Sequence, residues 1–221
     1  ATSLLLMSVN ANATFSMIAY DSSTGEFGAA LASCVKLPST TDVSSFLNVI
    51  VPNKGIFTTQ ASVSFPNTNL EQAKLKLQSG NYNGDQIINW LKANDQDSTP
   101  NIRQYLTLSK TQGFAYSGSQ IPQSFGSLIG TNYVIAGNTL DPNVLTTMEQ
   151  GFTNNTGSLK SKLLAALTSV EKANIGDTRC TKHGVSSHTA FVKVGTSSTF
   201  YNSQANNTDA IEELVKLIPN P

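Results

Sequence analysis

Hydrophobic residues alternate with polar or small residues in several short segments, which is the pattern of β-strands with one face in a core. The first segment is Thr14-Phe15-Ser16-Met17-Ile18-Ala19-Tyr20-Asp21, and a turn at Gly25 separates it from a second segment, Phe27 to Val35. The two predict a hairpin, and the small residues of the second suit a strand closely covered on both faces. Further predicted strands are 46–51, 55–64, 105–108, 113–118, 132–138, 185–194 and 198–203.

Elsewhere apolar positions recur every three or four residues, which predicts amphipathic helices. The first is expected to open at Asn69 and to end at Gly80, and the second to span 84–93. Asp141-Pro142 puts a proline at the first position of a third helix, and two more are predicted over 157–170 and 208–218. Blocks of strands beside blocks of helices favour an α+β fold over alternating βαβ units, and a four-layer sandwich with two sheets inside is one solution.

Length and charge narrow the classes of function. The chain has 221 residues, about one ordinary domain, with 14 Lys plus Arg balanced by 14 Asp plus Glu. A neutral chain with only 13% charged residues has no electrostatic footprint for nucleic acid or an anionic membrane. No apolar run approaches the roughly 20 residues that span a bilayer. We therefore expect no nucleic acid and no membrane as partner, and leave a homo-oligomer open.

The first 13 residues differ in kind from the rest. An apolar run, Leu4 to Met7, leads into Ala11-Asn12-Ala13, the small-x-small pattern after which a signal peptidase cuts. We expect residues 1–13 to be a leader or signal-peptide remnant and residues 14–221 to be one domain of an exported protein, periplasmic or secreted. A cut after Ala13 would leave Thr14 with a free α-amine beside its hydroxyl, as an N-terminal nucleophile requires. An ordinary threonine after a cleavage site is the other interpretation.

Two cysteines, Cys34 and Cys180, allow more than one chemistry. In an exported protein an even number of cysteines predicts a disulfide, whereas in a cytosolic protein two buried thiols are the usual outcome. His183 and His188 bring the number of soft ligands to four, which is enough for zinc. No standard finger or His-Glu-x-x-His motif accompanies them, so we predict the disulfide, no metal and no cofactor.

Several segments together carry a resemblance to a known family. They are 14–21, 24–33, Thr59-Gln60-Ala61, Ala136-Gly137-Asn138, 159–167 and Gly176-Asp177-Thr178-Arg179. In order and spacing they resemble an uncharacterised family catalogued as domain of unknown function 1028, which looks like an N-terminal nucleophile (Ntn) hydrolase. The resemblance covers Thr14 to about Val194. It implies a four-layer αββα fold and a chain that begins at Thr14 once its leader is removed. The sequence departs from the family pattern at 180–187, where a short Gly-x-Gln-Ser segment looks replaced.

An Ntn-type enzyme would use the Thr14 amine to take the proton from the Thr14 hydroxyl, which would attack an amide carbonyl and form an acyl-enzyme. Asn138 or backbone N–H groups would hold the oxyanion, and Ser33 and Lys36 would tune the amine. The catalytic candidates are therefore Thr14, Ser33 and Asn138.

The candidates for substrate binding are Lys36, Thr59, Gln60, Asp177 and Arg179. Thr59 and Gln60 would line the cleft, whereas Asp177 and Arg179 would position substrate or simply pair with each other. The expected substrate is a small or peptide-like molecule with an amide bond. The alternative is an Ntn-like scaffold that binds a ligand or partner without turnover. A small zinc-binding domain ranks below both.

Overall fold

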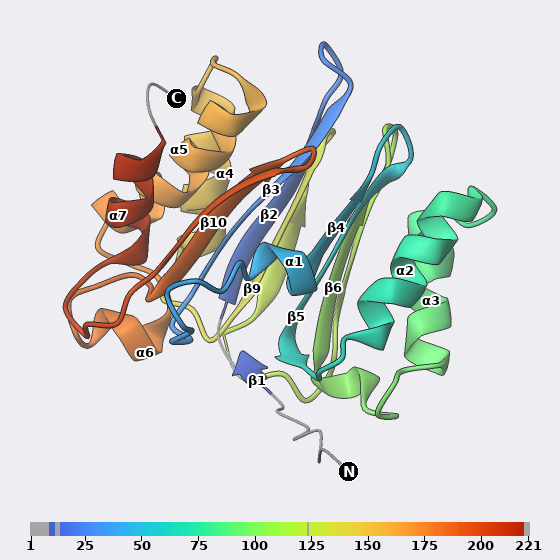
Figure 1. Ribbon diagram of the computed structural model, residues 1–221, viewed down its shortest axis with the longest axis horizontal. Helices are drawn as coiled ribbons and strands as arrows, with labels where there is room; N and C mark the ends of the chain where they lie inside the picture. Colours follow the sequence, from blue (N-terminus) through green and yellow to red (C-terminus); the bar gives the residue numbers. More distant parts are fainter. Residues whose placement is uncertain (1–8, 12–13, 123, 219–221) are drawn as a thin grey trace.

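The computed structural model describes residues 9–11, 14–122 and 124–218, which form two antiparallel β-sheets flanked by helices (Figure 1). The six-stranded sheet has the order β11-β10-β3-β2-β9-β8. Its strands are β2 (Thr14–Asp21), β3 (Glu26–Ser33), β8 (Gly126–Ile129), β9 (Tyr133–Asn138), β10 (Thr189–Val194) and β11 (Ser197–Asn202). The predicted β2–β3 hairpin is confirmed, and these two strands lie at the centre of the sheet.

The second sheet has five strands. They are β1 (Val9–Ala11), β4 (Asn48–Val51), β5 (Gly55–Val63), β6 (Arg103–Leu108) and β7 (Gly113–Ser117). One edge of β5 pairs with β6, which in turn pairs with β7. The other edge of β5 pairs with β4 over residues 55–58 and with β1 over residues 61–63. The chain therefore leaves the five-stranded sheet at Ala11 and starts the central strand of the other sheet at Thr14.

The two sheets face each other, and helices cover their outer faces (Figure 1). The helices on the five-stranded sheet are α2 (Thr68–Ser79) and α3 (Gly84–Ala93). Those on the six-stranded sheet are α4 (Val144–Asn154), α5 (Leu159–Lys172) and α7 (Ala210–Leu217). The fold class is α+β, as predicted, with one apolar cluster between the sheets and one beneath each group of helices.

Strand β2 shows how the sequence pattern positions the core. Phe15 and Met17 point toward the helices, whereas Ile18 and Tyr20 point toward the other sheet, as the period of two requires. In β3 the small residues permit close packing, since a Cβ on Gly28 would lie 2.7 Å from Leu163 Cδ1 of α5. Because side chains alternate along β2, Thr14 and Ser16 lie on its inner face with Ile18 and Tyr20.

The structure corrects several predicted strand boundaries. The predicted strand 46–51 is only partly a strand, because residues Ser44–Leu47 form a short helix, α1. The predicted strand 185–194 begins only at Thr189, because the backbone at Ser186 and His188 bonds to Asp177 and Ser33 instead of a ladder. The sequence analysis also missed β1, β8, a single 3-10 turn at Pro100–Ile102 and a short helix, α6 (Thr178–Thr181).

Two helix starts were also misplaced. Helix α2 begins at Thr68, because the side chain of Asn67 caps it by accepting a 3.1 Å hydrogen bond from the Leu70 N–H. Pro142 is not the first residue of α4, which begins at Val144 after Asn143 in a left-handed conformation with φ 69°. The proline belongs instead to the turn that connects β9 to α4.

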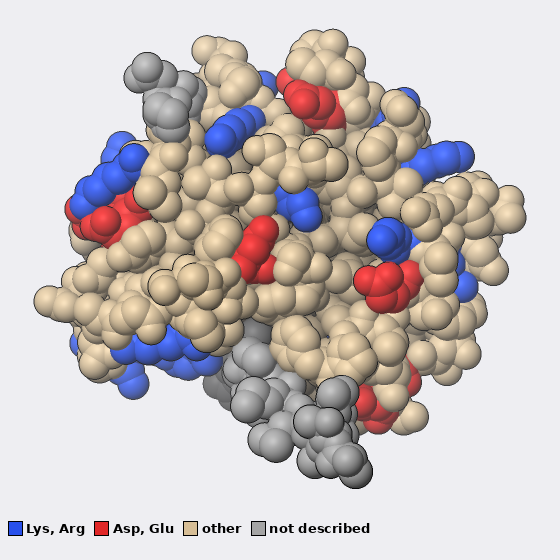
Figure 2. Space-filling view, viewed as in Figure 1, with Lys and Arg blue, Asp and Glu red and all other residues tan. Residues whose placement is uncertain are grey.

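Two features bear on possible partners: how the charged residues are distributed over the surface, and how long and apolar the helices are. On the face in Figure 2, Lys, Arg, Asp and Glu are scattered among other residues rather than gathered by sign. Within the described ranges, none of the helices has both the length and the apolar composition that a membrane crossing requires.

Candidate functional site

The candidate site lies between the two sheets, at the end of the central strand β2. Thr14, the first residue of β2, is fully buried, with 0% of its surface exposed. In the ladder it stands opposite Ser33 of β3 on one side and Asn138 of β9 on the other. Directly opposed residues project their side chains to the same face, with Cβ atoms about 5 Å apart. The register alone therefore brings together the three predicted catalytic residues.

Hydrogen bonds connect the hydroxyl groups at this position. Thr14 Oγ1 donates to Ser33 Oγ at 3.2 Å, and the backbone N–H of Val35 donates to the same Ser33 oxygen at 3.3 Å. A Cβ on Gly137 would lie 2.9 Å from the Thr14 carbonyl oxygen, so only glycine permits this approach of β9. The backbone and side chain of Thr14 are thus both fixed by its two neighbouring strands.

A buried polar network crosses from the five-stranded sheet to this site. Ser16 Oγ donates to Gln60 Oε1 at 2.6 Å, and Gln60 Nε2 donates to Gln104 Oε1 at 2.6 Å. Asn138 Nδ2 donates to the same Gln104 oxygen at 3.2 Å. Gln104 and Gln60 are both 0% exposed. The network holds Asn138 in place, and Gln104 is a site residue that the sequence analysis missed.

The network also fixes which way the amides point. Gln104 Nε2 lies 3.1 Å from the carbonyl oxygen of Gly137, and a carbonyl can only accept. That end of Gln104 must be the nitrogen, so its oxygen faces Asn138, whose nitrogen in turn must face Gln104. Asn138 Oδ1 is left buried, with no hydrogen-bond partner among the described residues. Such an orphaned acceptor beside Thr14 calls for a donor.

A narrow pocket opens next to Thr14 and Ser33. Its remaining wall is formed by side chains that are mostly apolar, from β3, the start of β10 and the segments around α1 and β5: Leu31, Val35, Leu37, Val43, Phe46, Leu47, Val63, Phe65 and Thr189. None of these residues is charged. The pocket has a volume of about 20 Å³, room for about one water molecule. In this form of the chain it is too small for a substrate.

Asp177 and Arg179 lie at the same end of the six-stranded sheet, next to the end of β3. Asp177 is 0% exposed, and its Oδ2 accepts from the backbone N–H of Cys34 at 2.7 Å. The Arg179 guanidinium pairs with the same carboxylate, with Nη2 2.8 Å from Oδ2. Asp177 also caps α6, because its Oδ1 accepts from the Arg179 N–H. Of the two predicted roles, mutual pairing is the one that the contacts describe.

Two predicted binding residues lie elsewhere. Lys36 is exposed, and its Nζ donates to Gln204 O at 3.2 Å and to Asn206 Oδ1 at 2.6 Å. Thr59 shares a face of β5 with Phe57, which packs under α2 and α3, so it points away from the space that Gln60 enters. Gln60 is therefore the predicted binding residue that reaches the network at Thr14.

The predicted disulfide is present. Cys34 and Cys180 are bonded, with their Cα atoms 5.6 Å apart, and the bond joins the end of β3 to α6. His188 lies beside it, with Nδ1 3.5 Å from Cys34 Sγ. His183 is exposed and does not belong to this cluster, so the four-ligand zinc set considered from sequence is not assembled.

A buried ion pair fixes the start of β6 one residue before Gln104. Arg103 Nε lies 2.9 Å from Asp95 Oδ2, and Arg103, which also pairs with Asp97, is only 2% exposed. Burial disfavours the charged carboxylate, but hydrogen bonds from Arg103 and from backbone N–H groups outweigh it and lower the pKa of Asp95 from 3.8 to about 2. The pair is a structural support for the strand that carries Gln104.

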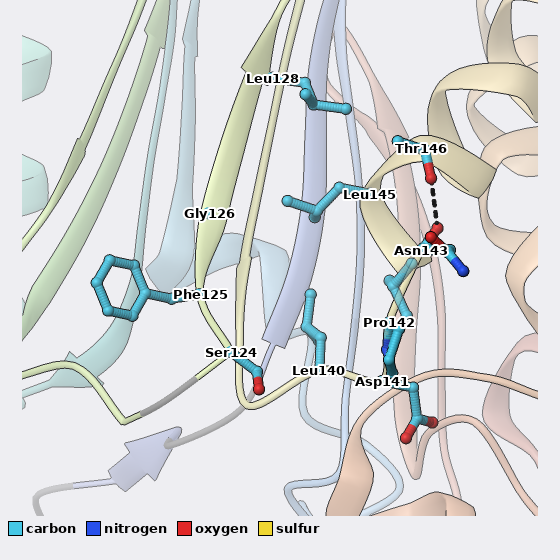
Figure 3. Close-up of a pocket in the computed structure, with 11 residues that line it drawn as sticks. Ser124, Phe125, Gly126, Leu128, Leu140, Asp141, Pro142, Asn143, Leu145 and Thr146 are labelled. Atoms are coloured by element: carbon cyan, nitrogen blue, oxygen red, sulfur yellow. Dashed lines mark hydrogen bonds between the residues drawn. The ribbon is translucent and has the colours of Figure 1, made fainter.

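A larger hollow, of about 320 Å³, lies between β8 and the start of α4 and does not include Thr14. Leu128, Leu140 and Leu145 line it in Figure 3, and Asp141 is the one charged residue among its lining residues. The Asp141 carboxylate accepts a hydrogen bond from the Gly176 N–H at 3.1 Å.

A comparison with known protein families identifies the family of the chain. A family described as "Family of unknown function (DUF1028)" matches residues 14–209. The chain belongs to the DUF1028 family. The match begins at Thr14, the first residue of β2.

The fold of this DUF1028 protein is shared with a solved relative. The crystal structure of protein SPO2555 from Silicibacter pomeroyi, also assigned to DUF1028, superimposes with a TM-score of 0.75. The two are 22% identical, and the match covers 93% of this chain and 87% of that one. The search of curated proteins found no match.

Proposed function

We propose that this DUF1028 protein is an Ntn hydrolase that cleaves an amide bond with Thr14 after the Ala13–Thr14 peptide bond has been cut. The observation that carries the proposal is the position of Thr14. It begins the central strand, on the inner face, between Ser33 and Asn138, at the residue where the family match begins. The sheet order with helices outside both sheets supports assignment to the αββα sandwich of that class.

The chemistry requires the α-amine that cleavage would release. Near pH 7–8 part of the population of a free α-amine is neutral, because its ordinary pKa is about 7.7–8.0. The neutral amine takes the hydroxyl proton as Thr14 Oγ1 bonds to the carbonyl carbon of the substrate. The C–N bond of the amide then breaks, the leaving amine takes the proton, and water hydrolyses the ester to return free Thr14.

The contacts of Asn138 suggest a role different from the one expected from sequence. One hydrogen of Asn138 Nδ2 is already given to Gln104, and Oδ1, which has no hydrogen-bond partner among the described residues, is an acceptor. An oxyanion needs donors, whereas a released amine is itself a donor. We therefore assign Asn138 to orienting the Thr14 amine, and Ser33 to holding the Thr14 hydroxyl. Backbone N–H groups are left as the source of oxyanion stabilisation.

Export of the protein is part of the same proposal. It is supported by the Ala11-Asn12-Ala13 pattern and by the Cys34–Cys180 disulfide, since such bonds persist in oxidising compartments. The pairing of β1 with β5 occupies one edge of the five-stranded sheet. While residues 9–11 hold that edge, an extended substrate cannot pair with it.

An amidase screen tests the proposal. A protein that starts at Thr14 is compared with the 221-residue chain on a panel of acyl and aminoacyl anilides. We expect hydrolysis by the first alone, retention of activity in Thr14→Ser, and a loss of at least about 1000-fold in Thr14→Ala. Thr107→Ala, the same change at a buried threonine beneath α3, is the control and should stay active. Equal activity in Thr14→Ala would rule out the mechanism.

One observation favours a second candidate, a binding scaffold without turnover. None of the described residues that line the pocket is charged, so these residues supply no side-chain base beside the α-amine. Under this alternative, the protein that starts at Thr14 would bind amides or peptides while leaving them intact. Calorimetry on the same panel separates the two, because only the enzyme produces heat that grows with time.

A further inference from the structure

Three potential metal ligands converge next to the candidate site. Cys34 Sγ, Cys180 Sγ and His188 Nδ1 all lie within 4.8 Å of one another. Cys180 is fully buried and His188 is 4% exposed, while Cys34 is partly exposed, so the cluster is largely buried but reaches solvent at Cys34. In the oxidised chain the two sulfurs are bonded to each other and cannot act as thiolate ligands.

The imidazole of His188 is already oriented for coordination. Its Nε2 lies 3.2 Å from the backbone carbonyl oxygen of Asn206. Because a carbonyl only accepts, Nε2 must carry the proton, which leaves the lone pair of Nδ1 facing Cys34. A histidine that binds a metal almost always donates its other ring N–H in this way, commonly to a backbone carbonyl.

We propose that the reduced form of this protein binds Zn²⁺ through Cys34, Cys180 and His188. One of the ligand distances already fits a tetrahedral site, and reduction frees the two sulfurs to separate. With Zn–S of about 2.3 Å and Zn–N of about 2.0–2.1 Å, a tetrahedral angle places the sulfur about 3.6 Å from the nitrogen. The observed separation of Cys34 Sγ and His188 Nδ1 is 3.5 Å. Three protein ligands leave the fourth position for water or an exogenous donor.

Reduction and metal binding balance as two separate steps. A dithiol reductant gives two electrons and two protons to the Cys34–Cys180 bond and becomes a disulfide itself. Two thiols result, and each gives up its proton to solvent when its sulfur binds Zn²⁺. The disulfide and the metal site therefore exclude each other, and the redox state of the surroundings selects between them.

In the reduced chain, the metal would connect the end of β3 to α6 in place of the disulfide. In the oxidised chain the bond fixes the end of β3 to α6, next to Ser33 and therefore next to Thr14. A bound Zn²⁺ would join the same two segments through Cys34 and Cys180, and would add the segment of His188. The reduced chain, as it exists before oxidation, thus keeps the end of β3 in place.

The test uses the full chain in reduced and oxidised forms under anaerobic conditions. The reduced protein is prepared with a phosphine reductant, and Zn²⁺ is titrated against a chromophoric chelator. Co²⁺ serves as a second probe, since thiolate ligands give a sulfur-to-cobalt absorption. We expect one ion per reduced chain and none per oxidised chain. His188→Gln should weaken binding at least about 10-fold, because even loss of an outer hydrogen-bond partner has an effect of that size.

The chain offers a matched control in its other histidine. His183→Gln changes an exposed imidazole three residues from Cys180, and should leave the affinity unchanged. Equal weakening by His183→Gln and His188→Gln would overturn the proposal, because it would mean that an unfolded reduced chain binds zinc without a specific site. Equal zinc binding by the reduced and oxidised proteins would overturn it as well.

Discussion

Removal of the Cys34–Cys180 bond should destabilise the protein strongly. The bond closes a long loop, with a sequence separation of 146 residues. The entropy of closing such a loop in the unfolded chain, −2.1 − 1.5R ln n cal/mol/K, corresponds to about 5 kcal/mol at 25 °C. A whole domain is stable by only about 5–15 kcal/mol. The variant Cys34→Ala/Cys180→Ala should therefore lose a large share of its free energy of unfolding.

Urea unfolding measures this loss. The single tryptophan, Trp90, lies on α3 against the other sheet, so its fluorescence reports global unfolding rather than changes near the bond. We expect the midpoint to fall and the m-value to rise, because an unfolded chain without the cross-link exposes more surface. A phosphine reductant with a metal chelator should reproduce the loss in the wild type and do nothing to the variant. A loss below about 1 kcal/mol, or an unchanged m-value, would refute the loop-entropy reasoning.

Three further predictions concern the buried polar groups. Asp95→Asn should lower the free energy of unfolding by about 3 kcal/mol, because it takes a charge from the buried Arg103, whereas the exposed Asp85→Asn should change little. Folding lowers the pKa of Asp95 from 3.8 to about 2, so the ionised carboxylate adds about 2 kcal/mol to the free energy of unfolding. This contribution should be complete above pH 3.8 and lost as the pH falls through 2. The acid dependence should be absent in Asp95→Asn. Gln104→Leu should lower the free energy of unfolding by about 2–4 kcal/mol, measured in urea, because Gln60 and the other partners of Gln104 would be left buried without a hydrogen bond. An unchanged free energy of unfolding would contradict the network.

Much of the fold could be predicted from the sequence because hydrophobic periodicity is a local signal. The β2–β3 hairpin and the helices α3 and α5 are long or strongly patterned, so their positions were predicted closely. The four-residue strand β8 has no such pattern, and it exists because β9 provides a ladder for it. Residues 185–188 looked like a strand, but Asp177 and Ser33 take their backbone hydrogen bonds.

Site residues that lie in recognisable sequence segments were predicted. Those that reach the site only through the pairing of distant strands were missed. Thr14 came from the Ala11-Asn12-Ala13 cleavage pattern before it, and Ser33 and Asn138 were given roles around it in an Ntn-type reaction. The strand register brings the three together. Gln104 fell just outside the predicted strand 105–108, so its long-range contact with Asn138 had no local signal. The hint in the sequence is that the polar residue Gln104 directly precedes the mostly apolar run 105–108. The side to which Thr59 points follows from the pairing of β5 with its neighbours and could not be read from the pattern.

The central claim, that a released Thr14 is a nucleophile, can be tested by covalent labelling. A peptidyl epoxyketone forms a ring with a residue that has both a free amine and a hydroxyl on adjacent carbons. We expect intact mass and peptide sequencing to find one adduct, on Thr14, in the protein that starts at this residue. The full chain and Thr14→Ala should remain unlabelled. A folded protein that starts at Thr14 and takes no label, or a label that persists in Thr14→Ala, would contradict the account.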